Sequence, residues 1–379
     1  MLEHLFFMLF ALGTFAIGVY VIRNNVKFFN MFKISQKNNY RPSVSVIAPV
    51  RDTDEKFEEN ILSLLKQKYK GKWEVLFVVD EDDRKTRDSV NKIIKKYKNA
   101  RLVKNIILPT CSGKSSAMIC GYDNAKYEVI AGYDSDVKIP ESWLTSLVNP
   151  LKNERTGGTT GYRFYAPFGS YVLSAWNAIG FISMRKHVFT WGGSFAIKKA
   201  LAEKLHVREK WKHSISDDVV ITNSLKEAKL QNMFVPGCVG ISYPSKFSHI
   251  TEFTTRQVTI VRWHWIEAFI AGFILYFVTR ISILFGVVAL YIYAVTGNAL
   301  YGIESALFLS FILLELIRAN IDFNNFSCHV CKIPSRLKWN VAYLAAQWLM
   351  AYNILAAMNK KTIMWRGRKY DFSREIKHV

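Results

Sequence analysis

The chain has few cysteines and lacks the motifs of several common protein classes. Its five cysteines give no disulfide framework, and Cys328-His329-Val330-Cys331, although spaced like zinc ligands, has no second ligand pair beside it. Ser112-Gly113-Lys114-Ser115 is not a P-loop, because Leu108 stands where that motif requires its upstream glycine. No recognised nucleic-acid-binding motif is present. These absences exclude a disulfide scaffold, a P-loop nucleotide hydrolase and a nucleic-acid partner from the first expectations.

Acidic residues are also scarce, and the chain is unusually apolar for one so basic. The 30 acidic residues are outnumbered by 51 Lys and Arg, which gives a formal net charge of +21, while 50% of the residues are hydrophobic. A basic balance fits nucleic acid, an anionic membrane surface or a phosphorylated substrate. The long apolar segments favour the membrane.

The first apolar segment, Leu5 to Ile22, carries no charge and is just long enough to cross the hydrocarbon core of a bilayer. A cleaved signal peptide is the alternative, but Glu3 and His4 precede the run where a signal peptide has basic residues. Three cations follow the run: Arg23, Lys27 and Lys33. We therefore predict an integral membrane protein with a transmembrane anchor over residues 1–25 and the following chain in the cytoplasm.

Further apolar segments begin after Trp263. They are Trp265 to Val278, Ile281 to Val295, Leu300 to Ile317 and Trp339 to Met358. We predict an interfacial segment over residues 251–263, membrane helices over 264–358 and a basic tail over 359–379. Because Arg280 separates the first two segments, they form either one interfacial helix plus one span or two short spans. The flanks of the last segment are both basic, so it is either re-entrant or an exception to the positive-inside rule.

Residues 40–250 show the alternation of strands and helices that is typical of a parallel α/β sheet. Four apolar strands are predicted: Val44 to Val50, Trp73 to Val79, Arg101 to Leu108 and Val129 to Tyr133. Helices are predicted between them: Asp54 to Gln67, Thr86 to Tyr97 and Ser115 to Ala125. Ligands bind at the carboxyl ends of such strands. Asp52, Asp80 and Asp134 all fall at or just past these ends, which marks that edge as a candidate site.

Asp134-Ser135-Asp136 is the most informative triplet in the chain, because it follows directly on a buried strand. Two carboxylates at this spacing suit Mg²⁺ or Mn²⁺, which take oxygen ligands and bridge them to substrate phosphates. The alternative is a solvated turn in which Ser135 or Asp136 caps a helix. The other polar groups at the same edge favour the metal site.

Other groups at the predicted edge also have two interpretations. Asp80 begins Asp80-Glu81-Asp82-Asp83, in which a carboxylate either binds a nucleoside or lies in a solvated turn. Asp217-Asp218 precedes an apolar stretch, so the pair either caps a helix or supplies a general base to an acceptor hydroxyl. Lys114 lies in a strand-to-helix turn, where its charge could meet a phosphate or a base. Arg262-Trp263 is either an interfacial anchor or part of the site.

The order of these motifs resembles that of membrane-bound family-2-type glycosyltransferases, and most closely the ceramide glucosyltransferase group. The resemblance covers nearly the whole chain. It also includes Trp191-Gly192-Gly193-Ser194 and the tail segment Trp365-Arg366-Gly367-Arg368-Lys369-Tyr370. Two positions depart from the family pattern. Thr259 stands three residues before Arg262 where Gln or Arg is common, and the acidic pair begins with Asp217 instead of Glu.

The resemblance implies a cytoplasmic GT-A (nucleotide-diphospho-sugar transferase) domain with membrane helices at both ends. It implies a nucleotide-sugar donor, with a UDP-sugar as the first expectation, Mg²⁺ or Mn²⁺ as cofactor, and a lipid acceptor from the bilayer. The implied reaction is inverting transfer in one displacement. The implied site residues are Asp80, Lys114 and Asp134 for the donor, Asp134 and Asp136 for the metal, Asp218 as base, and Arg262 and Trp263 on the diphosphate and acceptor.

Two alternatives to a single-transfer enzyme remain at this point. One is a polysaccharide synthase, although the predicted membrane segments are few for a channel. The other is a membrane protein with a degenerate, non-catalytic transferase domain, against which the complete acidic set argues. The aromatic stretch Tyr171 to Trp191, with Arg185 and Lys186, is either a membrane-docking element beside the acceptor entrance or an ordinary core helix.

Overall fold

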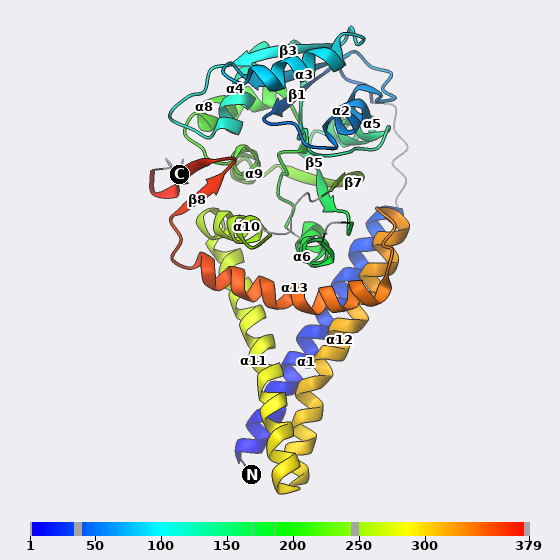
Figure 1. Cartoon of the computed structure of the whole chain (residues 1–379), viewed down its shortest axis with the longest axis vertical. Helices are drawn as coiled ribbons and strands as arrows, with labels where there is room; N and C mark the ends of the chain where they lie inside the picture. Colours follow the sequence, from blue (N-terminus) through cyan, green and yellow to red (C-terminus); the bar gives the residue numbers. More distant parts are fainter. Residues whose placement is uncertain (1, 34–39, 169, 186, 244–249, 375–379) are drawn as a thin grey trace. The chain divides into compact units, whose positions relative to one another are not determined.

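The computed structural model describes residues 2–33, 40–168, 170–185, 187–243 and 250–374. The chain forms two compact units. The helical unit comprises residues 1–33, 166–182 and 244–363, and the α/β unit comprises 34–165, 183–243 and 364–379. The predicted domain over 40–250 is therefore interrupted, because residues 166–182 belong with the helical unit. Figure 1 labels many of the elements of both units.

The α/β unit is built on a seven-stranded sheet with the strand order β3-β2-β1-β4-β6-β5-β7. Its strands are β1 Val44–Val50, β2 Trp73–Asp80, β3 Ala100–Asn105, β4 Val129–Tyr133, β5 Thr156–Tyr165, β6 Ser194–Lys198 and β7 Gln231–Ser242. Strands β3, β2, β1 and β4 pair in parallel, as predicted. Strand β6 is antiparallel to both β4 and β5, so the sheet is mixed. The predicted α/β class with flanking apolar helices is confirmed.

Helices cover both faces of this sheet. They are α2 Phe57–Leu65, α3 Arg84–Ile94, α4 Gly113–Asn124, α5 Trp143–Val148, α7 Lys199–Lys204, α8 Val207–Trp211 and α9 Asp217–Glu227. Successive strand residues face opposite sides, so Val46 and Ala48 join one core with α2 and α5, whereas Ile47 joins another with α4 and α8. Strands buried on both faces need apolar residues at nearly every position, which explains the unbroken apolar runs of β1 and β2.

The helical unit contains α1 Leu2–Phe29, α6 Tyr171–Phe181, α10 Ile250–His264, α11 Ile266–Thr296, α12 Ala299–His329 and α13 Arg336–Ala357. Among the described helices, three are long and apolar enough to cross a membrane: the α1 segment, α11 and α12. They run side by side in Figure 1. Gly297, with a left-handed φ of 67°, ends α11, and the Asn298 side chain caps α12.

Arg280 does not divide the membrane segment as the sequence suggested. Both predicted pieces, Trp265 to Val278 and Ile281 to Val295, form the single helix α11. Arg280 is tolerated because its guanidinium pairs with Glu315 of α12, and both side chains are buried. The last predicted membrane segment forms α13, which is not one of the three candidate spans.

The aromatic stretch from Tyr171 to Trp191 divides between the two units. Most of α6 is buried in the helical unit, where Phe181 has no exposed surface and its ring lies 5.2 Å from Phe28 and 5.6 Å from Phe326. Phe181 is therefore a core residue, not a ring presented to a membrane. Lys186 lies outside the described residues.

Candidate active site

The polar side chains of the α/β unit gather where its parallel strands end. Asp80 is the last residue of β2, and Asp52 and Asp134 follow β1 and β4. Strand β6 runs antiparallel to β4, so Gly193, just before β6, lies at the same edge. Strand β5 is antiparallel to β6 in turn, which brings Arg163 near its carboxyl end to this edge as well. Sheet topology therefore assembles one site from segments far apart in the chain.

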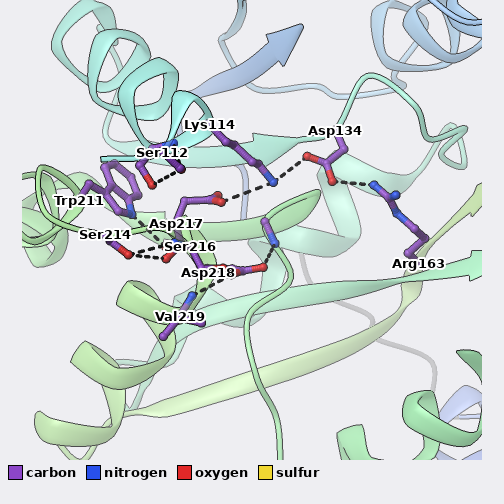
Figure 2. A network of polar contacts seen from close by, with 12 residues as sticks. Ser112, Lys114, Asp134, Arg163, Trp211, Ser214, Ser216, Asp217, Asp218 and Val219 are labelled. Atoms are coloured by element: carbon purple, nitrogen blue, oxygen red, sulfur yellow. Dashed lines mark hydrogen bonds and ion pairs between the residues drawn. The ribbon is translucent and has the colours of Figure 1, made fainter. Parts of the chain in front are cut away.

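Lys114 lies at the centre of this edge. The Ser112 side chain caps α4 by accepting from the Ser115 amide, which sets Lys114 in the first turn. Figure 2 shows the Lys114 ammonium between Asp134 and Asp217, at 2.8 Å and 3.5 Å from a carboxylate oxygen of each. Burial by itself lowers the pKa of Lys114, but the carboxylates of Asp134, Asp217 and Asp218 outweigh burial and raise it. The lysine is therefore a permanent positive charge inside the site.

Arg163 binds both carboxylates of the predicted metal triplet. Its Nη2 donates to Asp134 at 2.7 Å and to Asp136 at 2.8 Å, and its Nη1 donates to the other oxygen of Asp136 at 3.2 Å. The rings of Trp191 and Tyr165 lie 5.3 Å and 5.6 Å from the guanidinium. Sequence reasoning missed this residue. The sequence marks Arg163 only as the one charged residue in the otherwise uncharged segment that forms β5.

Asp134 is consequently ionised. Burial pushes the pKa of Asp134 upward, but Lys114 and Arg163 hold it below its usual value. Asp134, just after β4, forms one charged network with Lys114 of α4 and Asp217 of α9 (Figure 2).

The adjacent carboxylates of Asp217 and Asp218 have different environments. Asp217 is 1% exposed, and its Oδ2 has no hydrogen-bond partner among the described residues. Burial raises the pKa of Asp217 to about 7, although Lys114 acts to lower it. Asp218 is partly exposed and accepts from the Ser216 hydroxyl at 2.7 Å and from the Gly192 amide at 3.2 Å. Asp218 is thus oriented and accessible, whereas Asp217 is enclosed.

Asp80 lies at the other end of the edge. It accepts from the Asn105 side-chain amide at 2.8 Å, and the guanidinium of Arg368 lies 3.6 Å from its second oxygen. Arg368 comes from a C-terminal hairpin of β8 Thr362–Trp365 and β9 Arg368–Asp371. Arg366 and Gly367 turn this hairpin with positive φ values of 50° and 75°.

The turn of this hairpin carries a second arginine to the site. Arg366 lies 3.7 Å from Asp52 and 3.7 Å from Asp136. The tail motif noted in the sequence therefore reaches the carboxyl ends of β1, β2 and β4. The sequence offered no role for its arginines.

Arg262 and Trp263, the remaining predicted site residues, belong to the helical unit. Both lie on α10 and donate to the backbone carbonyl of Lys360, Arg262 at 3.3 Å and Trp263 at 2.9 Å. Thr259, which replaces the expected Gln or Arg, is buried and bonds to the Thr255 carbonyl within the same helix. Within their own unit, Arg262 and Trp263 connect α10 to the segment directly after α13.

Comparison with known proteins identifies this arrangement. Residues 6–377 match the family described as glycosyl transferase family 21. The chain belongs to glycosyl transferase family 21. It is therefore an enzyme that transfers a sugar.

The relatives of this glycosyltransferase are distant. The probable glycosyltransferase YdaM of Bacillus subtilis (strain 168) is 25% identical over 181 residues, which are 43% of this chain and 42% of that protein. An uncharacterized glycosyltransferase of Haemophilus influenzae is 26% identical over 170 residues, which are 44% of this chain and 64% of that protein. The glycosyltransferase thus matches less than two thirds of either relative.

Among solved structures, the mannosyltransferase PcManGT from Pyrobaculum calidifontis, in complex with GDP-Man and Mn²⁺, aligns with 93% of this chain and 100% of its own. The TM-score is 0.49 and the sequence identity is 15%.

Asp134 and Asp136 of the glycosyltransferase are ligands of the type that Mg²⁺ and Mn²⁺ prefer, since both offer carboxylate oxygens. Asp134 and Asp136 converge on one guanidinium, so their oxygens already lie around a shared cationic centre. Over the described part of the chain, no group of three or more His, Cys, Asp or Glu side chains is placed to hold an ion. Two hard carboxylate ligands suffice for Mg²⁺ or Mn²⁺ when substrate phosphates complete the coordination.

Proposed function

We propose that this glycosyltransferase moves a sugar from a nucleotide sugar, with a UDP-sugar as first candidate, to the hydroxyl of a membrane lipid, as ceramide glucosyltransferases do. The observation that carries the proposal is the charged network of Asp134, Lys114 and Asp217 at the strand ends, with Asp218 beside it. This edge combines carboxylates for a metal, cations for a diphosphate and a separate, accessible carboxylate for proton transfer.

Asp80, Lys114 and Asp134 would hold the donor. Asp80, oriented by Asn105, accepts from donor groups of the nucleoside. The Lys114 ammonium offsets the charge that develops on the departing diphosphate. Asp134 and Asp136 would hold Mg²⁺ or Mn²⁺, which when bound supplies further charge neutralisation at the leaving group.

Asp218 would act as the general base. The Gly192 amide and the Ser216 hydroxyl hold its carboxylate in place, and its partial exposure leaves it open to an acceptor. Asp218 takes the proton of the acceptor hydroxyl as that oxygen bonds to the anomeric carbon and the diphosphate leaves. One displacement inverts the configuration, so no protein nucleophile is required. Asp217 is less suited to this role because its side chain is enclosed.

The lipid acceptor is supported by the helical unit. Its three candidate spans match an integral membrane protein, and a bilayer-borne acceptor needs an enzyme held at that surface. The cations after the first apolar run support a cytoplasmic catalytic unit. In this proposal Arg262 and Trp263 complete the site, on the diphosphate and the acceptor.

The test is a transfer assay with the full-length protein in lipid nanodiscs. Nucleotide sugars are supplied one at a time with a long-chain lipid acceptor such as ceramide, with divalent ion or with chelator, and products are identified by mass spectrometry. A single glycolipid of inverted anomeric configuration is expected, with loss of activity in chelator. A long polysaccharide would identify a synthase instead, and the absence of both transfer and donor hydrolysis would indicate a non-catalytic protein.

The side of the membrane is tested separately. Protease should digest the α/β unit in inverted membrane vesicles and spare it in intact cells. The opposite pattern would contradict the cytoplasmic placement.

A further inference from the structure

Arg163 uses the same oxygens that a divalent ion would use. Its guanidinium forms three hydrogen bonds to Asp134 and Asp136, all at 3.2 Å or less. The fourth oxygen of the two carboxylates, Oδ1 of Asp134, pairs with Lys114 at 2.8 Å. An ion that coordinated both carboxylates would therefore bind an oxygen that already accepts from Arg163, and the two positive charges would repel each other at that distance.

Arg163 is held in the site by more than these carboxylates. The Tyr165 hydroxyl lies 3.0 Å from its Nη1, and the rings of Tyr165 and Trp191 flank the guanidinium. Its Nε is buried without a hydrogen-bond partner among the described residues. The arginine is therefore anchored at the site while its donors are not fully used.

We propose that Arg163 is an internal competitor of the metal, which gives up the oxygens of Asp134 and Asp136 only when the ion arrives together with the donor diphosphate. The inference rests on the proposed function. It makes Arg163 the residue that couples ion binding to donor binding.

The charges of the site support this coupling. The two carboxylates already contact Lys114 and Arg163, and Arg366 lies 3.7 Å from Asp136, so a divalent ion alone would add to the positive charge around them. A diphosphate entering with the ion offsets that added charge. It also offers new acceptors to the displaced guanidinium, whose planar fork is well matched to phosphate oxygens. Ion and diphosphate should therefore each bind more tightly in the presence of the other.

The experiment compares Mn²⁺ binding with and without UDP in the full-length detergent-solubilised protein, measured by the electron paramagnetic resonance of free Mn²⁺. In the wild type, UDP should tighten Mn²⁺ binding by about 5- to 150-fold, the usual range of coupling between two ligands. In Arg163→Gln, Mn²⁺ alone should bind more tightly, and the gain from UDP should be smaller than in the wild type, because only the direct coordination of the ion by the diphosphate remains.

Arg208→Gln is the matched control. Arg208 also forms a bidentate pair with an aspartate, Asp123, at 2.6 Å and 2.7 Å. This pair lies on the surface, away from Asp134 and Asp136. The Arg208→Gln variant loses one positive charge, as Arg163→Gln does, and should bind Mn²⁺ with the affinity of the wild type. If Arg163→Gln does not fold, Arg163→Lys replaces it. Lysine keeps the charge but lacks the planar fork with which Arg163 makes three hydrogen bonds to the two carboxylates, so a smaller gain in Mn²⁺ affinity is expected.

Several results would overturn the inference. Unchanged or weaker Mn²⁺ binding in the Arg163 variants, with normal coupling to UDP in the wild type, would refute the competitor role and leave the proposed function intact. Weaker UDP binding without metal, and no gain in Mn²⁺ affinity, would make Arg163 only a phosphate ligand. Failure of every variant to bind Mn²⁺, even with UDP, would reject the metal site itself along with the inference.

Discussion

Replacing Lys114 with methionine removes the ammonium that lies between Asp134 and Asp217 and keeps an apolar stem of similar length. Asp134 retains Arg163 as a partner, but the enclosed Asp217 loses its counter-ion. Removing one partner of a buried ion pair typically costs about 3–5 kcal/mol of unfolding free energy, because a charge is left uncompensated. Lys114→Met should lose stability in that range when Asp217 is ionised.

The loss should depend on pH with a definite sign. Burial raises the pKa of Asp217 from 3.8 to about 7 in the folded protein. A carboxyl whose pKa rises on folding stabilises the fold below its unfolded pKa, and this contribution is lost as the pH rises through the folded pKa. Without Lys114 the pKa of Asp217 rises further, so the cost of Lys114→Met should be smaller at pH 5 than at pH 8.

The assay is thermal unfolding of the detergent-solubilised protein at both pH values, with Asp217→Asn and the double variant Lys114→Met/Asp217→Asn measured in parallel. Asp217→Asn removes the carboxylate that Lys114→Met leaves without a counter-ion. The effects of the two substitutions on the free energy of unfolding should therefore be coupled by about 0.5–3 kcal/mol. Lys138→Met is the control. Lys138 pairs with Glu59, but both side chains are over 40% exposed, and such pairs contribute about 1 kcal/mol or less.

The reasoning would be refuted by an equal loss of stability at pH 5 and pH 8, or by additive effects in the double variant. Either result would mean that Lys114 does not neutralise Asp217.

The remaining predictions concern the reaction and the helical core. Asp218→Asn should keep nucleotide binding and lower transfer by roughly 10²-fold or more, as is usual for a general base; near-normal turnover would remove Asp218 from the mechanism. Asp136→Ala should abolish the response to Mg²⁺ or Mn²⁺ and weaken donor binding, provided that chelator inactivates the wild type. Phe181→Ala should destabilise the protein by about 3–5 kcal/mol and reduce lipid transfer and donor hydrolysis together, because Phe181 is buried; selective loss of transfer would place it at the lipid entrance.

Much of the architecture follows from local patterns in the sequence. The predicted strands Val44 to Val50 and Val129 to Tyr133 match β1 and β4 at both ends, because unbroken apolar runs are typical of strands buried on both faces. The apolar segments Leu5 to Ile22 and Leu300 to Ile317 lie within α1 and α12, because an apolar run of about 18 residues or more is typical of a membrane-spanning helix. Asp80 and Asp134 were located at strand ends from the chain alone, and parallel pairing brings those ends to one edge.

Only the tertiary structure decided which side chains the charged residues contact. Asp136 and Arg163 are 27 positions apart, and they meet only because β6 enters the sheet antiparallel between β4 and β5. Arg280 interrupted an apolar pattern in the sequence, yet it continues a helix because Glu315 reaches it from α12.

Asp217 and Asp218 are equivalent in composition and adjacent in the chain, but one is enclosed beside Lys114 and the other is open beside Gly192. Hydrophobic periodicity is a property of neighbouring residues, so the sequence contains it. The partner, burial and ionisation of a charged side chain depend on segments that only folding brings together.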